Sequence, residues 1–202
     1  MIFFLDPFAV RTKEFDEEQA LARAVQMFWT RGYEGTSMHD LERAMGIKRQ
    51  SLYNTFESKQ ALFERALAHY HQSVIIPNLA ALRTSKAPMK AIENYFRARI
   101  DDVFDPSAIK GCLITNSVTE RAIFDERVRA LTAQSIEYMQ GAFTAAVANA
   151  RKSGEIGQDK DPVLWGALLV NCAQGLFVLS KIRPDRKTLT ASVKKLLDLL
   201  KS

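Results

Sequence analysis

The sequence predicts an all-α protein of about nine helices, in which a small N-terminal helix-turn-helix unit sits on a larger C-terminal helical bundle. Two observations lead to this fold class. Apolar residues recur almost throughout at the period of amphipathic helices, and no stretch has the alternation of a convincing strand. The periodic stretches are separated by short connections, as in helical bundles. No internal repeat or low-complexity segment is found.

The first three predicted helices form a unit over residues 16–58, in front of a tail over residues 1–15. Ser, Thr or Asp residues can cap helices and Gly residues can end them. In chain order these signals are Asp16, Gly32, Thr36 or Ser37, and Gly46. The helices are expected after residue 16 to residue 31, at 38–45 and at about 49–55. The apolar stripe of the first helix is Leu21, Ala24, Val25, Phe28 and Trp29.

Residues 59–202 are expected to form the larger domain, because the character of the pattern changes near Ser58. Capping residues and prolines again delimit each helix. The capping residues are Ser58, Asp125, Asp161 and Thr188, and the prolines are Pro77, Pro88, Pro106, Pro162 and Pro184. The helices are expected at 59–76, 88–104, 111–120, 125–152, 161–182 and 188–200.

Composition narrows the class of protein. A chain of 202 residues with 47% hydrophobic and 25% charged residues can bury a sizeable core. Only two cysteines, Cys112 and Cys172, exclude a disulfide scaffold and favour a reducing compartment, so we expect a cytoplasmic protein. The apolar start MIFFLDPFAV lacks a basic segment and is interrupted by Asp6 and Pro7, which makes it a poor secretory signal.

Helices 38–45 and 49–55, joined by Gly46-Ile47-Lys48, have the spacing of a helix-turn-helix. The total charge of +5 does not itself point to this region, since residues 1–60 contain eight basic and nine acidic groups. The charge is local: Arg43 to Lys59 contains four basic groups and one acidic group. In such a unit the second helix enters the DNA major groove with its N-terminal residues facing base edges.

The polar side chains of this unit have the chemistry that DNA contacts need. Arg can bind guanine and Gln can bind adenine through paired hydrogen bonds, whereas hydroxyl, amide and ammonium groups commonly hold phosphates. The candidate DNA contacts are Thr36, Ser37, Lys48, Arg49, Gln50, Tyr53, Asn54 and Lys59. The alternative interpretation is a solvated, charged face on a helix that only packs.

The stretch TSMHDLERAMGIKRQSLYNTFESKQALF resembles the DNA-binding signature of the TetR (tetracycline-repressor-like) family of bacterial regulators. The resemblance covers about the first 65 residues and rests on Phe28, Gly32-Tyr33, Thr36-Ser37, Ala44 to Ile47, Leu52-Tyr53, Phe56, Ser58-Lys59 and Leu62. It implies phosphate contacts from Tyr53, Asn54 and Lys59 and a groove-facing set at 48–50. Lys48 and Gln50 depart from the pattern, because small residues are common at both positions.

The resemblance also implies a homodimer formed through the helices at about 161–182 and 188–200. Helix 161–182 is apolar nearly all round, so it must be buried on several sides or lie in lipid. Its length approaches the roughly 20 residues of a membrane span. Asn171 and Gln174 lie in its middle and no second such segment exists, so an intersubunit helix is preferred to a membrane span.

The larger domain would hold an unknown small-molecule effector. Apolar cavities with a few polar groups bind such ligands, although aromatic residues at helical spacing are more often core. The candidate pocket residues are Tyr95, Phe96, Phe104, Cys112, Asn116, Met139, Phe143, Trp165, Asn171 and Gln174. Cys112 starts a helix, where a thiol can become reactive, but an inert buried cysteine is the alternative. Cys172 has the position of a structural residue.

Three function classes compete. The first is a ligand-responsive transcriptional regulator, expected to be a repressor that binds an inverted-repeat operator. The second is a helical protein-binding adaptor without DNA readout. An enzyme is not expected: Ser37, His39 and Asp40 lie on one short helix and cannot face one another, and no phosphate loop is found. His69 and His71 are two residues apart and cannot chelate a metal from one helix face. We therefore expect no catalytic residue, metal or cofactor.

Overall fold

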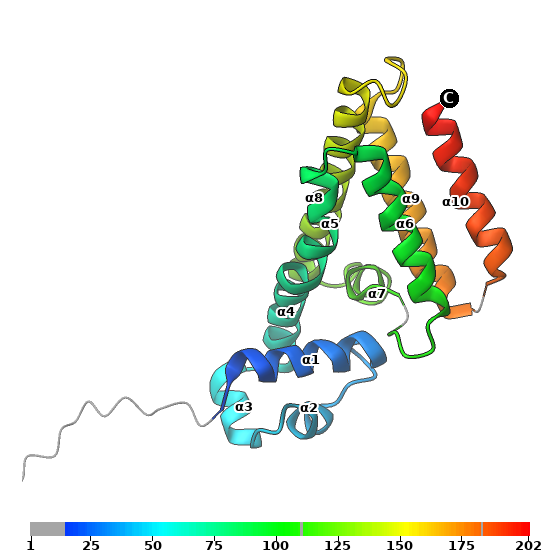
Figure 1. Ribbon diagram of the computed structural model, residues 1–202. Helices are drawn as coiled ribbons and strands as arrows, with labels where there is room; N and C mark the ends of the chain where they lie inside the picture. The colour runs from blue at the N-terminus through cyan, green and yellow to red at the C-terminus, as the bar shows by residue number, and fades with distance from the viewer. Residues whose placement is uncertain (1–14, 110, 183) are drawn as a thin grey trace, which may run out of the picture.

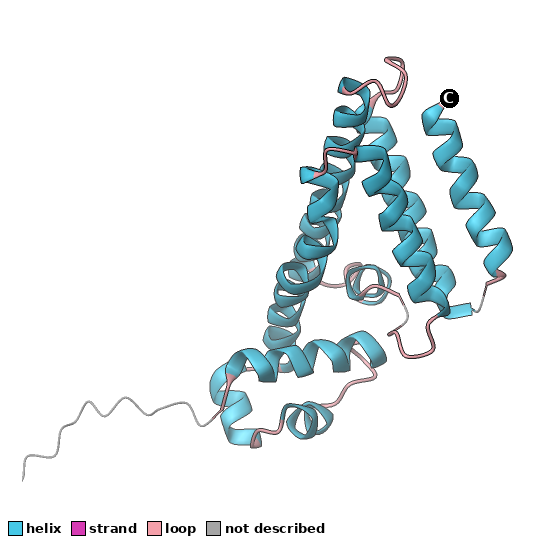
Figure 2. Cartoon of the chain, viewed as in Figure 1, coloured by secondary structure: helices cyan, strands magenta, loops and turns pink. Residues whose placement is uncertain are grey.

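The computed structural model describes residues 15–109, 111–182 and 184–202, and these residues form helices without strands (Figures 1 and 2). The helices are α1 (Glu17–Arg31), α2 (Met38–Met45), α3 (Arg49–Phe56), α4 (Lys59–Tyr70), α5 (Ile76–Thr84), α6 (Pro88–Phe104), α7 (Leu113–Glu120), α8 (Glu126–Lys152), α9 (Pro162–Leu179) and α10 (Arg186–Lys201). A π-helical segment, η1 (His71–Ile75), joins α4 to α5 without a break, so the described residues contain nine rods. The all-α prediction of about nine helices is confirmed.

The N-terminal unit of α1, α2 and α3 lies across one end of the bundle (Figure 1). Its core is apolar and fully buried. Phe28 of α1 packs edge to face on Phe63 of α4, with 4.9 Å between the ring centroids. Asp16 caps α1 by accepting from the backbone N–H of Gln19 at 3.1 Å, as expected. Helix α4 packs on α1 and also on α8, so it joins the unit to the bundle.

The sequence predicts that the helix beginning at Lys59 ends before Pro77. This prediction was wrong. The chain passes through η1 and continues as α5 to Thr84. Proline lacks an N–H donor and normally breaks a helix interior. Here the wider π turn directly precedes Pro77, which stands in the first turn of α5, where its missing donor costs least.

In the bundle, α8 and α9 pack along each other, and α6 lies against both (Figure 1). Asp125 and Asp161 cap α8 and α9 as expected, each accepting from two backbone N–H groups. Helix α10 packs on α6. It begins at Arg186 rather than Thr188, because Asp185 is the residue that caps it, accepting from the N–H of Thr188 at 2.7 Å.

Helix α9 continues as the short 3₁₀ turn η2 (Ser180–Ile182). Within the part of the chain that the structure describes, Pro162–Ile182 is the one helix long and apolar enough to cross a membrane, and one third of that stretch is buried. A single such helix is weak evidence, because a helix in a core or an interface has the same composition. Its packing along α8 accounts for the buried third.

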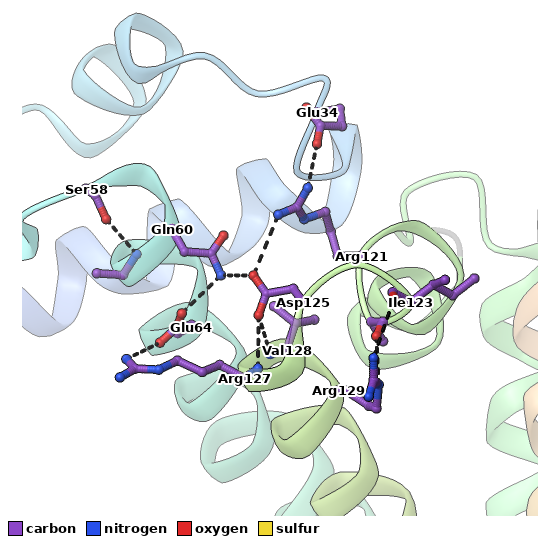
Figure 3. A network of polar contacts seen from close by, with 12 residues as sticks. Glu34, Ser58, Gln60, Glu64, Arg121, Ile123, Asp125, Arg127, Val128 and Arg129 are labelled. Atoms are coloured by element: carbon purple, nitrogen blue, oxygen red, sulfur yellow. Dashed lines mark hydrogen bonds and ion pairs between the residues drawn. The ribbon is translucent and has the colours of Figure 1, made fainter.

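The turn at residues 32–37, between α1 and α2, is bound to the bundle by α7. The carboxylate of Glu120 accepts from the backbone N–H of Tyr33 at 3.0 Å and of Glu34 at 2.9 Å. The next residue, Arg121, pairs with Glu34 at 3.0 Å and with Asp125 at 3.6 Å. Figure 3 shows that Gln60 of α4 also contacts Asp125, so three helices share one polar network.

We predict that Glu120→Ala lowers the free energy of unfolding by about 1–2 kcal/mol, because two backbone donors lose a charged acceptor. Chemical denaturation of the purified chain measures this change. Glu137→Ala is the control, since Glu137 is exposed in the middle of α8 and its loss should change stability by less than about 0.5 kcal/mol. Equal stability of the two variants would contradict the role given to Glu120.

Candidate nucleic-acid interface and cavity

Helix α3 is held by one face and exposed on the other. Ile47, Leu52 and Phe56 are buried and pack it against the core of the N-terminal unit. The opposite face carries Arg49, Gln50, Tyr53 and Asn54, all of which are exposed. The helix therefore presents polar side chains to solvent along its whole length.

The N-terminus of α3 is open. Lys48 occupies the N-cap position and makes no side-chain capping bond, in agreement with the departure seen in the sequence. Gly46 precedes it with a φ of 70°, which an L-residue adopts only with strain. Arg23 of α1 donates to the carbonyl of Met45 at 3.3 Å and so stabilises the turn between α2 and α3. Uncapped backbone N–H groups and the cationic Lys48 and Arg49 make this end of the helix attractive to anions.

Within the described residues, the contacts made by the exposed side chains of α3 are with one another. Gln50 Nε2 donates to Asn54 Oδ1 at 2.9 Å, and the guanidinium of Arg49 lies 5.7 Å from the centroid of the Tyr53 ring. Such contacts within an exposed helix contribute a few tenths of a kcal/mol, about 0.2–0.5. A base edge or a phosphate can therefore replace them at little cost.

The remaining predicted DNA contacts lie around the turn at residues 32–37 and the start of α4. Ser37 caps α2: its Oγ accepts from the N–H of Asp40 and donates to the Asp40 carboxylate at 2.6 Å, which lowers the pKa of that carboxyl group. Lys59 Nζ lies 4.2 Å from the centroid of the Tyr33 ring. Thr36 requires a correction, because its side chain is fully buried and its hydroxyl donates to the Gly32 carbonyl. Thr36 therefore stabilises the turn, and its side chain is not accessible to a phosphate.

The bundle contains a cavity of about 280 Å³ between α1, the α4–α5 rod, α6 and α9. Its walls are mostly apolar and aromatic, and they include Trp29, Tyr70, Val74, Leu79, Tyr95, Arg99, Asp102, Val103, Gly111, Cys112, Met139 and Phe177. Three of the ten predicted pocket residues, Tyr95, Cys112 and Met139, lie in this wall. The indole of Trp29 donates to the carbonyl of Gly111 at 3.2 Å, so α1 itself closes one side.

The other predicted pocket residues lie elsewhere. Phe96 and Phe143 are fully buried and pack on each other where α6 meets α8. Phe104 lies beneath Arg186, Asn116 borders a separate hollow, and Gln174 accepts from Thr115 at 2.5 Å. Asn171 is exposed, and Trp165 is outside the cavity wall. Helical periodicity identified these residues as inward-facing or polar, but it carries no signal that separates a packed side chain from one bordering a void.

Three residues of the cavity wall or of the turn at residues 32–37 were not predicted from the sequence: Trp29, Arg99 and Glu120. Trp29 belongs to the predicted core stripe of α1, and Arg99 belongs to no predicted set. Arg99 lies one turn from Tyr95 on α6, and this spacing beside an aromatic residue was the available signal. Glu120 was also missed, since its partners are backbone groups that no side-chain pattern reveals.

The two cysteines are free and differ in environment. Cys112 is buried at the start of α7, where the Tyr70 hydroxyl donates to its Sγ at 3.5 Å. Cys172 of α9 is half-buried, and this burial raises the pKa of its thiol. Among the described residues no cluster of His, Cys, Asp or Glu has the arrangement of a metal site.

Two family models match the chain. Residues 20–66 match the bacterial regulatory proteins of the tetR family, and residues 88–196 match the tetracyclin repressor-like C-terminal domain. The first match covers the helix-turn-helix unit with the start of α4, and the second covers most of the bundle.

Individual proteins resemble the chain over most of its length. The HTH-type transcriptional regulator YezE of Bacillus subtilis (strain 168) is 32% identical over 179 residues, which are 87% of this chain and 91% of YezE. The HTH-type transcriptional repressor DhaR of Mycobacterium sp. (strain GP1) is 27% identical over 173 residues, 85% of each chain. A cysteine mutant of the TetR family regulator CifR, solved with 26-bp double-strand operator DNA, has a TM-score of 0.81 at 29% identity, over 92% of this chain and 97% of CifR. The protein therefore belongs to the TetR family and is a DNA-binding transcriptional regulator, not an enzyme.

Proposed function

We propose that this regulator is a cytoplasmic repressor that binds an inverted-repeat operator as a homodimer and is released by a small-molecule effector. The observation that carries the proposal is the docking of α3, which leaves Lys48, Arg49 and Gln50 exposed at an uncapped helix end. DhaR is a repressor, and the CifR structure contains operator DNA, which supports the same action here. The adaptor hypothesis lacks such support.

The exposed face of α9 supports the homodimer. Leu164, Leu168, Val178 and Ile182 are spaced as one helical face and are 40–70% exposed. Gly175 lies in the same row, and a Cβ atom there would meet nothing within 4 Å. An apolar stripe of this length on a soluble chain marks a protein contact, and a two-fold axis beside α9 would bury two copies of it. Two α3 helices related by that axis would read an inverted repeat.

Helices α1 and α7 connect the cavity to α3, the proposed recognition helix. Trp29 forms part of the cavity wall and is bonded to Gly111, which precedes α7. At its other end α7 binds the turn at residues 32–37, directly before α2. An effector that moves α6 or α7 would shift α1 and this turn, and so change the position of α3. Couplings of this kind are typically about 1–3 kcal/mol.

We predict that Gln50→Ala relaxes base preference at one position of the operator, with little loss of non-specific binding. A paired Gln–adenine contact contributes about 1–3 kcal/mol of discrimination, and the alanine cannot form it. Selection of binding sites from random duplexes measures the preference. An unchanged selected sequence would refute the assignment of Gln50.

Lys59→Ala and Tyr53→Phe are the matched comparison. Both side chains are predicted to hold phosphates, so both variants should weaken binding to all duplexes about equally. Lys59→Ala should also reduce the slope of log affinity against log salt by about one. A wild-type affinity that does not fall steeply with salt would favour the protein-binding adaptor instead.

We predict that Leu168→Asp makes the chain monomeric, because a charge in the apolar stripe of α9 would be buried without a partner. Sedimentation or light scattering gives the mass. Gln134→Asp is the control, since it places the same charge on the exposed polar face of α8. A Leu168→Asp chain that remains dimeric would place the subunit contact elsewhere, and selection of an unrepeated site would argue against paired α3 helices.

A further inference from the structure

The cavity has room for one ring and a short substituent. A cavity of about 150 Å³ lined by aliphatic and aromatic side chains takes up benzene, and this cavity measures about 280 Å³. Trp29, Tyr70, Tyr95 and Phe177 supply aromatic surfaces to its wall. Trp29 and Tyr70 pack edge to face at 4.9 Å, which fixes the rings at one end. A planar apolar body fits such walls.

Arg99 provides the cavity with a cation. Its side chain is 17% exposed, and its Nη2 pairs with Asp102 Oδ2 at 2.9 Å. Its guanidinium lies 5.6 Å from the centroid of the Tyr95 ring. Its Nε–H is buried and finds no hydrogen-bond partner within the described parts of the chain. Arg99 is the one cation among the described residues that line the cavity.

The wall also contains one anion, Asp102, which is the partner of Arg99. The Asp102 side chain is 54% exposed, so water screens its charge, whereas Arg99 is mostly buried. The charge of Arg99 extends to its neighbours: burial raises the pKa of Tyr95, and Arg99 acts against that rise. The Tyr95 hydroxyl stays protonated at neutral pH and can donate a hydrogen bond. An anionic ligand would therefore compete with the more exposed Asp102 for the more deeply buried Arg99.

We propose that the effector is a small carboxylate with a planar apolar body, whose acid group binds Arg99 while its ring lies between the aromatic walls. This inference rests on the proposed function in one respect, namely that the cavity is the effector site. An Arg–carboxylate contact can use two parallel hydrogen bonds and is about twice as strong as a neutral one. Neutral molecules of the same shape would lack a charge to pair with Arg99.

Calorimetric titration of the purified full-length chain tests the ligand class without DNA. The probes are benzoate and phenylacetate, each compared with its neutral amide. We expect each acid to bind roughly 10- to 100-fold more tightly than its amide, the range for a hydrogen bond to a charged group. Arg99→Met should abolish the difference, and Arg99→Lys should retain part of it, because lysine keeps the charge but not the paired donors of the guanidinium.

Arg97→Met is the matched control. Arg97 lies on the same helix but is exposed and bonded to Asn94, outside the cavity. It should keep the full preference for the acids. Equal affinity for acid and amide, a preference that survives in Arg99→Met, or no binding of either acid at millimolar concentration would each overturn the inference.

The same acids are then added to the complex of the wild-type chain with a duplex obtained by binding-site selection. Dissociation of the complex would support both proposals. If the acids bind through Arg99 and the complex stays intact, release by an effector fails as a function while the ligand assignment stands. If binding shows no role for Arg99, the ligand class is wrong and the DNA-binding function is unaffected.

Discussion

The exposed polar face of α3, which we propose contacts DNA, depends on the burial of Ile47, Leu52 and Phe56. Helix α3 has eight residues, and a helix of that length is not stable alone in water. Its existence and its orientation therefore both come from docking on α2 and α4. Because the docked residues occupy one face, the polar residues of the other face have nowhere to lie except solvent. The same contact that stabilises α3 thus selects which of its side chains face solvent.

The connection between the cavity and α3 is short and polar. Trp29 contributes to the core of the N-terminal unit and to the cavity wall, so a ligand can contact α1 directly. Tyr33 lies between two cations, Lys59 at 4.2 Å and Arg121 at 4.4 Å from its ring centroid. A predicted phosphate contact therefore shares an aromatic ring with the network of Figure 3. Movement of α7 would change the surroundings of Lys59 as well as those of α2.

The sequence predicted the elements whose signals are local. Asp16, Ser37, Ser58, Asp125 and Asp161 cap helices as expected, since capping depends on a few adjacent residues. It failed where the outcome depends on distant partners. The helix that begins at Lys59 continues past Pro77 through a π turn, and Asp185 rather than the predicted Thr188 caps the last helix. The cavity wall was predicted in part only, because a buried face does not reveal where neighbouring helices leave space.

We infer that the first turn of α3 contacts base edges in the major groove. The most direct measurement is a structure of the dimer bound to a duplex obtained by binding-site selection. We expect α3 in the major groove, with Arg49 or Gln50 within about 3 Å of a base-edge acceptor or donor, and Tyr53 and Lys59 on phosphates. A complex in which α3 lies outside the groove, or in which the side chains at 48–50 contact no base, would contradict the account.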